Sequence, residues 1–267
     1  MSPELKSHMS GIARKLLATL VTVGLIVAGV ALAQDPSSGI DRPDRLAQGE
    51  FEFVRLAYNG NPYYGGRAQQ SWSIDYPDAE HHFLKGIRRL TAVEAAEDGI
   101  VRTPLDNDIF DYPWLYVLEV GYWYLNDQEA ARLREYLLRG GFLMIDDFHG
   151  TFEWTAFMTS MNKIFPDRPV VEIPEGDEVF HVLYDLDQRI QIPSLQIMYT
   201  GVTYERDGFT PQWRGIYDDD GRLMVAINHN MDIGDAWEHA DLPEYPENMT
   251  ALAYRFGVNY VIYAMTH

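Results

Sequence analysis

The chain contains no cysteine among its 267 residues, which excludes a disulfide framework, a zinc–thiolate site and a thiol nucleophile. Basic residues are also scarce: 21 Lys and Arg stand against 40 Asp and Glu, giving a formal net charge of −19. Because binding to a phosphate backbone needs a basic surface, we expect no nucleic-acid partner. Neither a phosphate-cradling Gly-rich motif nor a Gly-x-Ser-x-Gly turn is present, so nucleotide binding and serine catalysis lack support.

The apolar content is sufficient for a folded core. Hydrophobic residues make up 46% of the chain and aromatic residues 13%. A disordered chain would be poorer in both, because it could not bury enough apolar surface to offset its conformational entropy. The length suits one large domain, which we assign to residues 50–267.

The first 33 residues have the features of an export signal. Arg14 and Lys15 precede an apolar run that ends in Ala31-Leu32-Ala33. A basic start, a short apolar segment and a small-x-small triplet are what signal peptidase recognises. We therefore predict an exported, periplasmic protein. The alternative is an N-terminal membrane anchor through an uncleaved signal, because roughly 18 apolar residues can just span a bilayer.

Two flanking segments are set apart from the domain. Residues 1–8, before Met9, are interpreted as vector-derived or as an alternative start. Residues 34–49 are rich in Pro, Ser, Asp and Gly and are interpreted as a linker.

The clearest structural unit lies in the middle of the chain. The continuous apolar run from Trp114 to Glu119 predicts a strand that is buried on both faces. Asn126, with Glu129 three residues later, predicts a capped helix that Gly140-Gly141 ends. The apolar run from Phe142 to Ile145 follows. Strand, helix and strand of these lengths predict a parallel pair joined by a right-handed crossover.

The remaining pattern predicts an α/β fold of the flavodoxin-like or glutamine amidotransferase-like kind, with a mostly parallel sheet flanked by helices. The further elements we expect are strands at 51–58 and 170–173, a helix at 78–90 capped by Asp78, a helix at 152–164, an irregular insertion at 174–213, a β-hairpin with strands at 216–217 and 223–227, and a closing helix at 248–264.

Polar residues follow three of the expected strands. They are Glu119, the run Asp146-Asp147-Phe148-His149, and the run Asn228-His229-Asn230-Met231-Asp232. Ligands of open parallel sheets bind at the carboxyl ends of the strands, so we expect these stretches to meet at one rim.

A divalent metal is the one cofactor that this rim suggests. Its candidate ligands are Asp147, His149, His229 and Asp232, because carboxylate and imidazole groups bind divalent ions. The alternative is structural: Asp147 caps the next helix and Asp232 forms an Asx-turn.

Acid/base catalysis is a second hypothesis for the same rim. Crowded carboxylates raise one another's pKa, so the candidates are Asp146 and Asp147, with His149 and His229. However, adjacent strand residues point to opposite faces, so the aspartates could instead be a buried network member and a cap. Whether the protein is an enzyme is left open.

Aromatic residues near the expected loops suggest a carbohydrate ligand, because sugar rings stack on aromatic faces and hydrogen-bond to acids. The alternative is ordinary core packing. The candidate ligand-binding residues are Trp72, Asp75, Tyr76, Glu119, Trp154, Asn230 and Trp237.

Several blocks of the chain resemble an uncharacterised bacterial family of exported proteins, a domain of unknown function with a class I glutamine amidotransferase-like fold. The blocks lie at 51–56, 72–79, 140–148, 199–203, 229–235 and 258–267. The resemblance implies that fold and no particular reaction. It places the thiol nucleophile of true amidotransferases after the strand 142–145, where this chain has Asp146-Asp147, so glutaminase activity is excluded.

The leading functional hypothesis is an exported, non-glutaminase domain that binds a ligand or an envelope protein at the carboxyl edge of its sheet. One alternative is a carboxylate- or metal-dependent hydrolase that acts on envelope carbohydrate. Another is a structural subunit of an envelope assembly.

Overall fold

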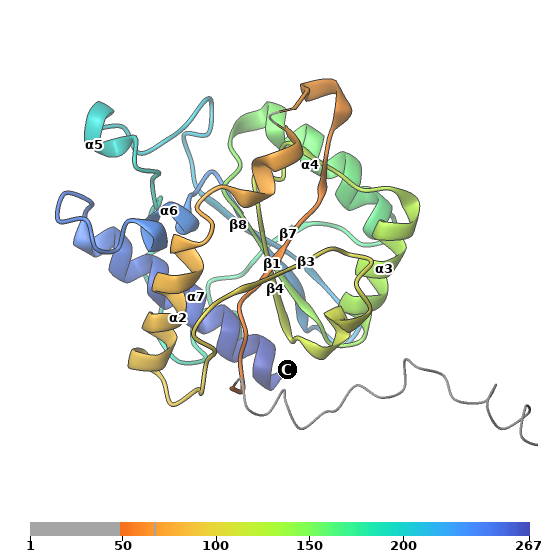
Figure 1. Cartoon of the computed structure of the whole chain (residues 1–267), viewed down its shortest axis with the longest axis horizontal. Coiled ribbons are helices and arrows are strands. Elements are labelled where there is room, and N and C mark those ends of the chain that lie inside the picture. The colour runs from red at the N-terminus through yellow and green to blue at the C-terminus, as the bar shows by residue number, and fades with distance from the viewer. Residues whose placement is uncertain (1–48, 67) are drawn as a thin grey trace, which may run out of the picture. The chain divides into compact units, whose positions relative to one another are not determined.

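The computed structural model describes residues 49–66 and 68–267 (Figure 1). The predicted export signal, 1–33, and the predicted linker up to residue 48 lie outside the described residues. Among the described helices, none combines the length and the apolar character that crossing a membrane requires.

A seven-stranded sheet forms the centre of the domain. In spatial order its strands are β3 (Ile100–Arg102), β1 (Val54–Leu56), β4 (Trp114–Leu118), β6 (Phe142–Asp146), β9 (Leu223–His229), β8 (Gln212–Tyr217) and β7 (Val171–Glu172). The first five run parallel, and β8 runs antiparallel to both of its neighbours. A small separate sheet pairs β2 (Asn59–Gly60) with β5 (Trp123–Tyr124). The predicted α/β class with a mostly parallel sheet is confirmed.

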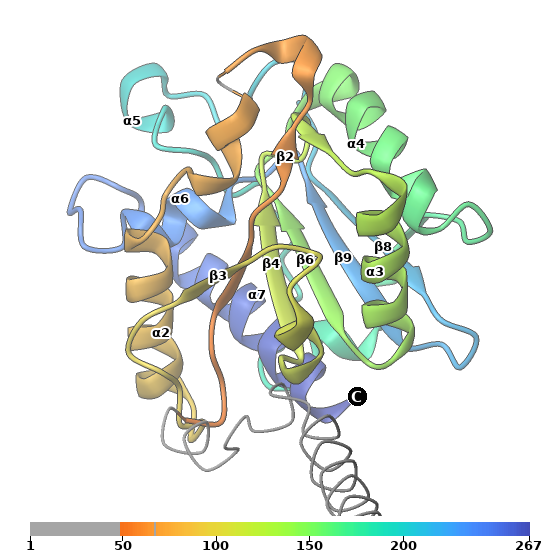
Figure 2. The same ribbon diagram turned by 45° about the vertical axis from the view of Figure 1, so that its right-hand side comes forward.

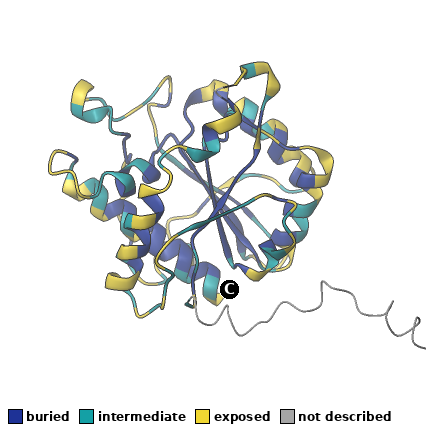
Figure 3. Ribbon diagram, in the orientation of Figure 1, coloured by how far each residue is buried: buried dark blue, intermediate teal, exposed yellow. Residues whose placement is uncertain are grey.

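Helices cover both faces of this sheet (Figures 1 and 2). On one face lie α2 (Asp78–Leu90), α6 (Ile233–Glu238) and α7 (Glu247–Thr266), and on the other lie α3 (Asp127–Leu138) and α4 (Gly150–Ile164). Alternate residues of β4 supply the two cores: Tyr116 packs with the α2 and α7 side, and Val117 with the α3 and α4 side. The central strands β1, β4, β6 and β9 are accordingly the most buried elements (Figure 3).

The predicted strand–helix–strand unit is confirmed. β4 and β6 pair in parallel from Trp114 opposite Phe142 to Leu118 opposite Asp146. The Asn126 side chain accepts hydrogen bonds from the backbone N–H groups of residues 128 and 129, and the Glu129 carboxylate accepts one from the N–H of Asn126. These local signals suffice to predict where the helix begins, because a capping box satisfies the N–H donors at the helix end without distant partners.

Other expectations need correction. Helix α2 has the predicted bounds, but Asp78 is its first helical residue and makes no capping bond. Leu90, the last residue of the helix, is 47% exposed. The first strand is shorter than predicted, because only Val54–Leu56 is in register with β3.

The insertion predicted at 174–213 ends earlier, because Gln212 and Trp213 already belong to β8. It lies against the carboxyl end of the sheet and against α7. It contains the 3-10 turn η5 (Glu178–Phe180) and the short helix α5 (Ile197–Thr200). Gln191 donates to the carbonyl of Asn230, and the backbone N–H of Leu195 donates to Asp235. On its other side the backbone N–H of Tyr184 donates to Asn259 of α7.

Candidate functional site

Three neighbouring strands end in the same strained turn. Glu119 after β4, Asp147 after β6 and Asn230 after β9 have φ angles of 52°, 47° and 64°. Residues other than glycine seldom adopt this left-handed conformation, and such strain is concentrated at functional sites. The turns are also bonded together: the N–H of Glu119 donates to the carbonyl of Asp147, and that of Asn230 to the carbonyl of Phe148. The three stretches therefore meet at one rim, as the sequence predicts.

Three carboxylates converge at this rim. Oxygen atoms of Asp75, Asp147 and Asp232 all lie within 4.8 Å of one another. They come from the loop before α2, the turn after β6 and the residue before α6. Asp147 is 7% exposed and Asp232 4% exposed. No Lys or Arg of the described residues is ion-paired with any of the three. We call this set the carboxylate cluster.

The cluster is electrostatically unfavourable when all three carboxylates are charged. Burial raises the pKa of all three carboxyls well above the ordinary aspartate value. Neighbouring acids raise these pKa values further, with Asp235 acting on Asp75 and Glu119 on Asp147. Each charged form is therefore disfavoured unless a proton or a cation compensates it.

Space inside the cluster depends on a glycine. A Cβ atom on Gly234 would lie 2.7 Å from Oδ2 of Asp75 and 2.6 Å from the hydroxyl of Tyr116. That Oδ2 atom is buried and has no hydrogen-bond partner. Only glycine lets the start of α6 approach the Asp75 carboxylate this closely.

Asp146 has a structural role next to the cluster. It is fully buried, and its Oδ2 accepts from the N–H groups of Ile233 and Gly234 at 2.8 and 2.9 Å and from Tyr116 at 3.1 Å. Its pKa is raised to about 7, chiefly by burial rather than by the crowding that the sequence suggests. Asp146 thus joins the start of α6 to the end of β6, and it is the expected buried network member.

The second aspartate of the pair is not a helix cap. The N-cap position of α4 belongs to His149, and the Asp147 carboxylate instead lies 3.2 Å from Nε2 of that histidine. Asp232, by contrast, does cap its helix, because its Oδ1 accepts from the N–H of Asp235. The structural alternative therefore fails for Asp147. Asp232 does have a structural role, but as a helix cap rather than in the predicted Asx-turn.

Neither candidate histidine belongs to a three-ligand set within the described part of the chain. Nε2 of His229 lies 3.2 Å from the carbonyl of Gly150, and Nδ1 lies 3.0 Å from the Gln212 side chain. Burial lowers the pKa of His229, and that of His149, to about 4, so both rings are neutral near pH 7. Because both ring nitrogens of His229 are engaged, it is not available as a metal ligand.

The aromatic candidates divide into buried and accessible residues. Trp237 is fully buried, with its ring 4.2 Å from that of Phe83, so its prediction as a ligand contact is wrong. It packs inward because α6 lies over the sheet. Trp72 is half-buried, Tyr76 is 41% exposed, and Trp154 is half-buried beside a cavity.

Two further candidate residues, Glu119 and Asn230, form hydrogen bonds that join neighbouring segments. The carbonyl of Glu119 accepts from the hydroxyl of Tyr58. The Asn230 side chain accepts from the N–H of Gly150 and donates to the carbonyl of Thr210. Both residues thereby hold the rim in place.

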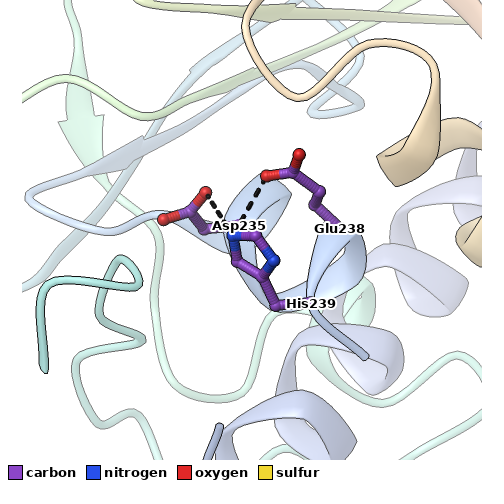
Figure 4. Close-up of side chains that lie close together, drawn as sticks. All are labelled: Asp235, Glu238 and His239. Atoms are coloured by element: carbon purple, nitrogen blue, oxygen red, sulfur yellow. Dashed lines mark ion pairs between the residues drawn. The ribbon is translucent and has the colours of Figure 1, made fainter. Parts of the chain in front are cut away.

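A second set of titratable side chains, not predicted as a metal or catalytic site, lies on α6 and its C-cap residue His239. Figure 4 shows the His239 imidazole facing the Asp235 and Glu238 carboxylates. Its Nε2 lies 3.6 Å from Oδ1 of Asp235 and 3.1 Å from Oε2 of Glu238. The spacing of three and four residues, which places side chains on one helix face, is the signal that could have found it.

A family model described as a domain of unknown function (DUF4159) covers residues 52–265. No curated protein matches the chain.

Proposed function

The chain belongs to the DUF4159 family, and we propose that this member binds a hard divalent cation in the carboxylate cluster at the rim of its sheet. The convergence of three carboxylates from separate segments, none of them ion-paired with a Lys or Arg of the described residues, carries the proposal. Such a set repels itself when charged, and a divalent cation removes that repulsion. Mg²⁺, Ca²⁺ and Mn²⁺ prefer carboxylate oxygen ligands of this kind.

Two other features support a cation over simple protonation. The backbone at Asp147 holds a strained φ of 47°, which directs that residue into the cluster at a cost in conformational energy. The chain's net charge of −19 also raises the local concentration of cations.

A bound cation defines what the site would do. Three protein carboxylates leave coordination positions for water or for the oxygen atoms of a ligand. The site would hold an oxygen-rich ligand, such as an envelope carbohydrate, through the metal. If the cation also activates a water molecule, the same site is that of a hydrolase.

A melting experiment tests cation binding. After treatment with a chelator, saturating Mg²⁺, Ca²⁺ or Mn²⁺ is expected to raise the melting temperature by about 5–10 °C, because ligand at about 100 times Kd adds about 2.7 kcal/mol. Asp232→Asn should abolish this shift. The matched control, Asp98→Asn, changes an aspartate that is 86% exposed and should leave the shift intact. A wild-type protein that none of the three cations stabilises would refute the proposal.

The amidotransferase-like fold is a second part of the proposal. Its support is the resemblance of the sequence together with the position of Asp147, which stands in a strained turn between β6 and α4. That is where the resemblance places the thiol of a true amidotransferase. The domain would then have exchanged a nucleophile for a cation ligand.

Export to the periplasm remains a proposal from the sequence. Expression of the full chain in a Gram-negative host should yield a periplasmic protein that begins at Gln34, because the triplet Ala31-Leu32-Ala33 precedes that residue. Mass spectrometry of the purified protein measures this. An intact N-terminus in the membrane fraction would support the anchor instead.

A further inference from the structure

A separate cavity opens between β8, the end of β9 and the start of α4. Its volume is about 340 Å³, and its walls include Trp154, Arg214 and His229. Phe209, which is 63% exposed, also lines it. No member of the carboxylate cluster does. This volume is at the small end of the range for ligand pockets.

Arg214 is the distinctive feature of this cavity. Its guanidinium carbon lies 4.3 Å from the centroid of the Trp154 ring. The guanidinium donates no hydrogen bond to any described residue, and its ion-pair partner Glu172 is 3.8 Å away and 62% exposed. By contrast, Arg134 and Arg168 each donate two hydrogen bonds to an aspartate. Arg214 is therefore held in position with its donors available.

Two other charged or titratable groups of the wall, Asp207 and His229, are already engaged. Asp207 accepts from the N–H and the hydroxyl of Thr151, at 3.0 and 2.7 Å, and makes no ion pair with Arg214. The ring of His229 lies 4.8 Å from that of Trp154 and is neutral near pH 7. The cavity thus offers one available positive charge beside aromatic surface.

We infer that this cavity binds a small sugar acid, with its carboxylate on Arg214 and the apolar face of its ring against Phe209. A guanidinium fork matches a carboxylate with two parallel hydrogen bonds, and sugar rings pack on aromatic surface. A phosphate dianion fits less well, because one guanidinium faces it and the carboxylates of Asp207 and Glu172 are near. This inference is independent of cation binding.

Calorimetric titration with D-glucuronate, in the presence of a chelator, tests the inference. We expect glucuronate to bind at least tenfold more tightly than D-glucose, which lacks the carboxylate, and than acetate, which lacks the ring. Equal binding of glucuronate and glucose, equal binding of glucuronate and acetate, or no binding of glucuronate would overturn it. The chelator ensures that failure here leaves the cation proposal untouched.

Variants locate the site. Arg214→Gln should weaken glucuronate binding at least tenfold, whereas Arg168→Gln, on an arginine already paired with Asp219, should not change it. Phe209→Ala, at a position that is 63% exposed, should weaken it several-fold. Wild-type affinity in both Arg214→Gln and Phe209→Ala would exclude this cavity as the site.

Discussion

Replacing Arg55 with Met is expected to lower the free energy of unfolding by about 3–5 kcal/mol, the typical cost of breaking a buried ion pair. Arg55 is fully buried and ion-paired with Glu80, which is 1% exposed. Without Arg55, the Glu80 charge has no partner in the core. Arg55 also donates to the carbonyls of Trp72 and Ile74, which precede Asp75. The variant should therefore also lose cation binding.

Urea denaturation of Arg55→Met and of the double variant Arg55→Met/Glu80→Met separates two effects. One is the unpaired charge of Glu80, and the other is the loss of the hydrogen bonds to the carbonyls before Asp75. The double variant should recover most of the stability, because apolar pairs commonly replace buried ion pairs at little cost. One polar atom of each partner is buried without a hydrogen bond, which favours this recovery. Cation binding should stay weak, since the carbonyls before Asp75 still lack their donor. A loss below about 1 kcal/mol in the single variant would show that the pair is unimportant.

Asp146→Ala is expected to cost about 3–5 kcal/mol of stability, because two N–H groups at the start of α6 and the hydroxyl of Tyr116 lose their common acceptor. Asp146→Asn should cost much less, about 1 kcal/mol. The amide keeps one oxygen acceptor. Because the pKa of the Asp146 carboxyl is about 7, the protonated, neutral form is well populated near that pH. The neutral amide of Asn resembles this form.

Equilibrium unfolding of the two Asp146 variants at pH 7, together with the cation-dependent shift in melting, checks this assignment. Asp146→Asn should keep the shift, because its oxygen still anchors α6 and hence Asp232. A folded Asp146→Asn protein without any cation response would instead make Asp146 a direct ligand. Equal stability of the Ala and Asn variants would show that the three hydrogen bonds contribute little.

Local signals in the sequence determined the central elements of the fold. The capping residues Asn126 and Glu129 and the stop at Gly140-Gly141 fixed α3, and the flanking apolar runs fixed β4 and β6 as a parallel pair. These signals act over a few residues, through hydrogen bonds and burial on one face of each element. The meeting of Glu119, Asp147 and Asn230 at one rim followed from them, because neighbouring parallel strands end on the same edge.

The tertiary structure alone decided which side chains share a site. Asp75 joins Asp147 and Asp232 only because packing brings the loop before α2 over the start of α6, where Gly234 leaves room. The burial of Trp237, the ion pair of Arg55 with Glu80, and the position of Arg214 over Trp154 likewise depend on distant segments. Capping and periodicity carry no information about such pairs, because their energies arise only once the elements have packed.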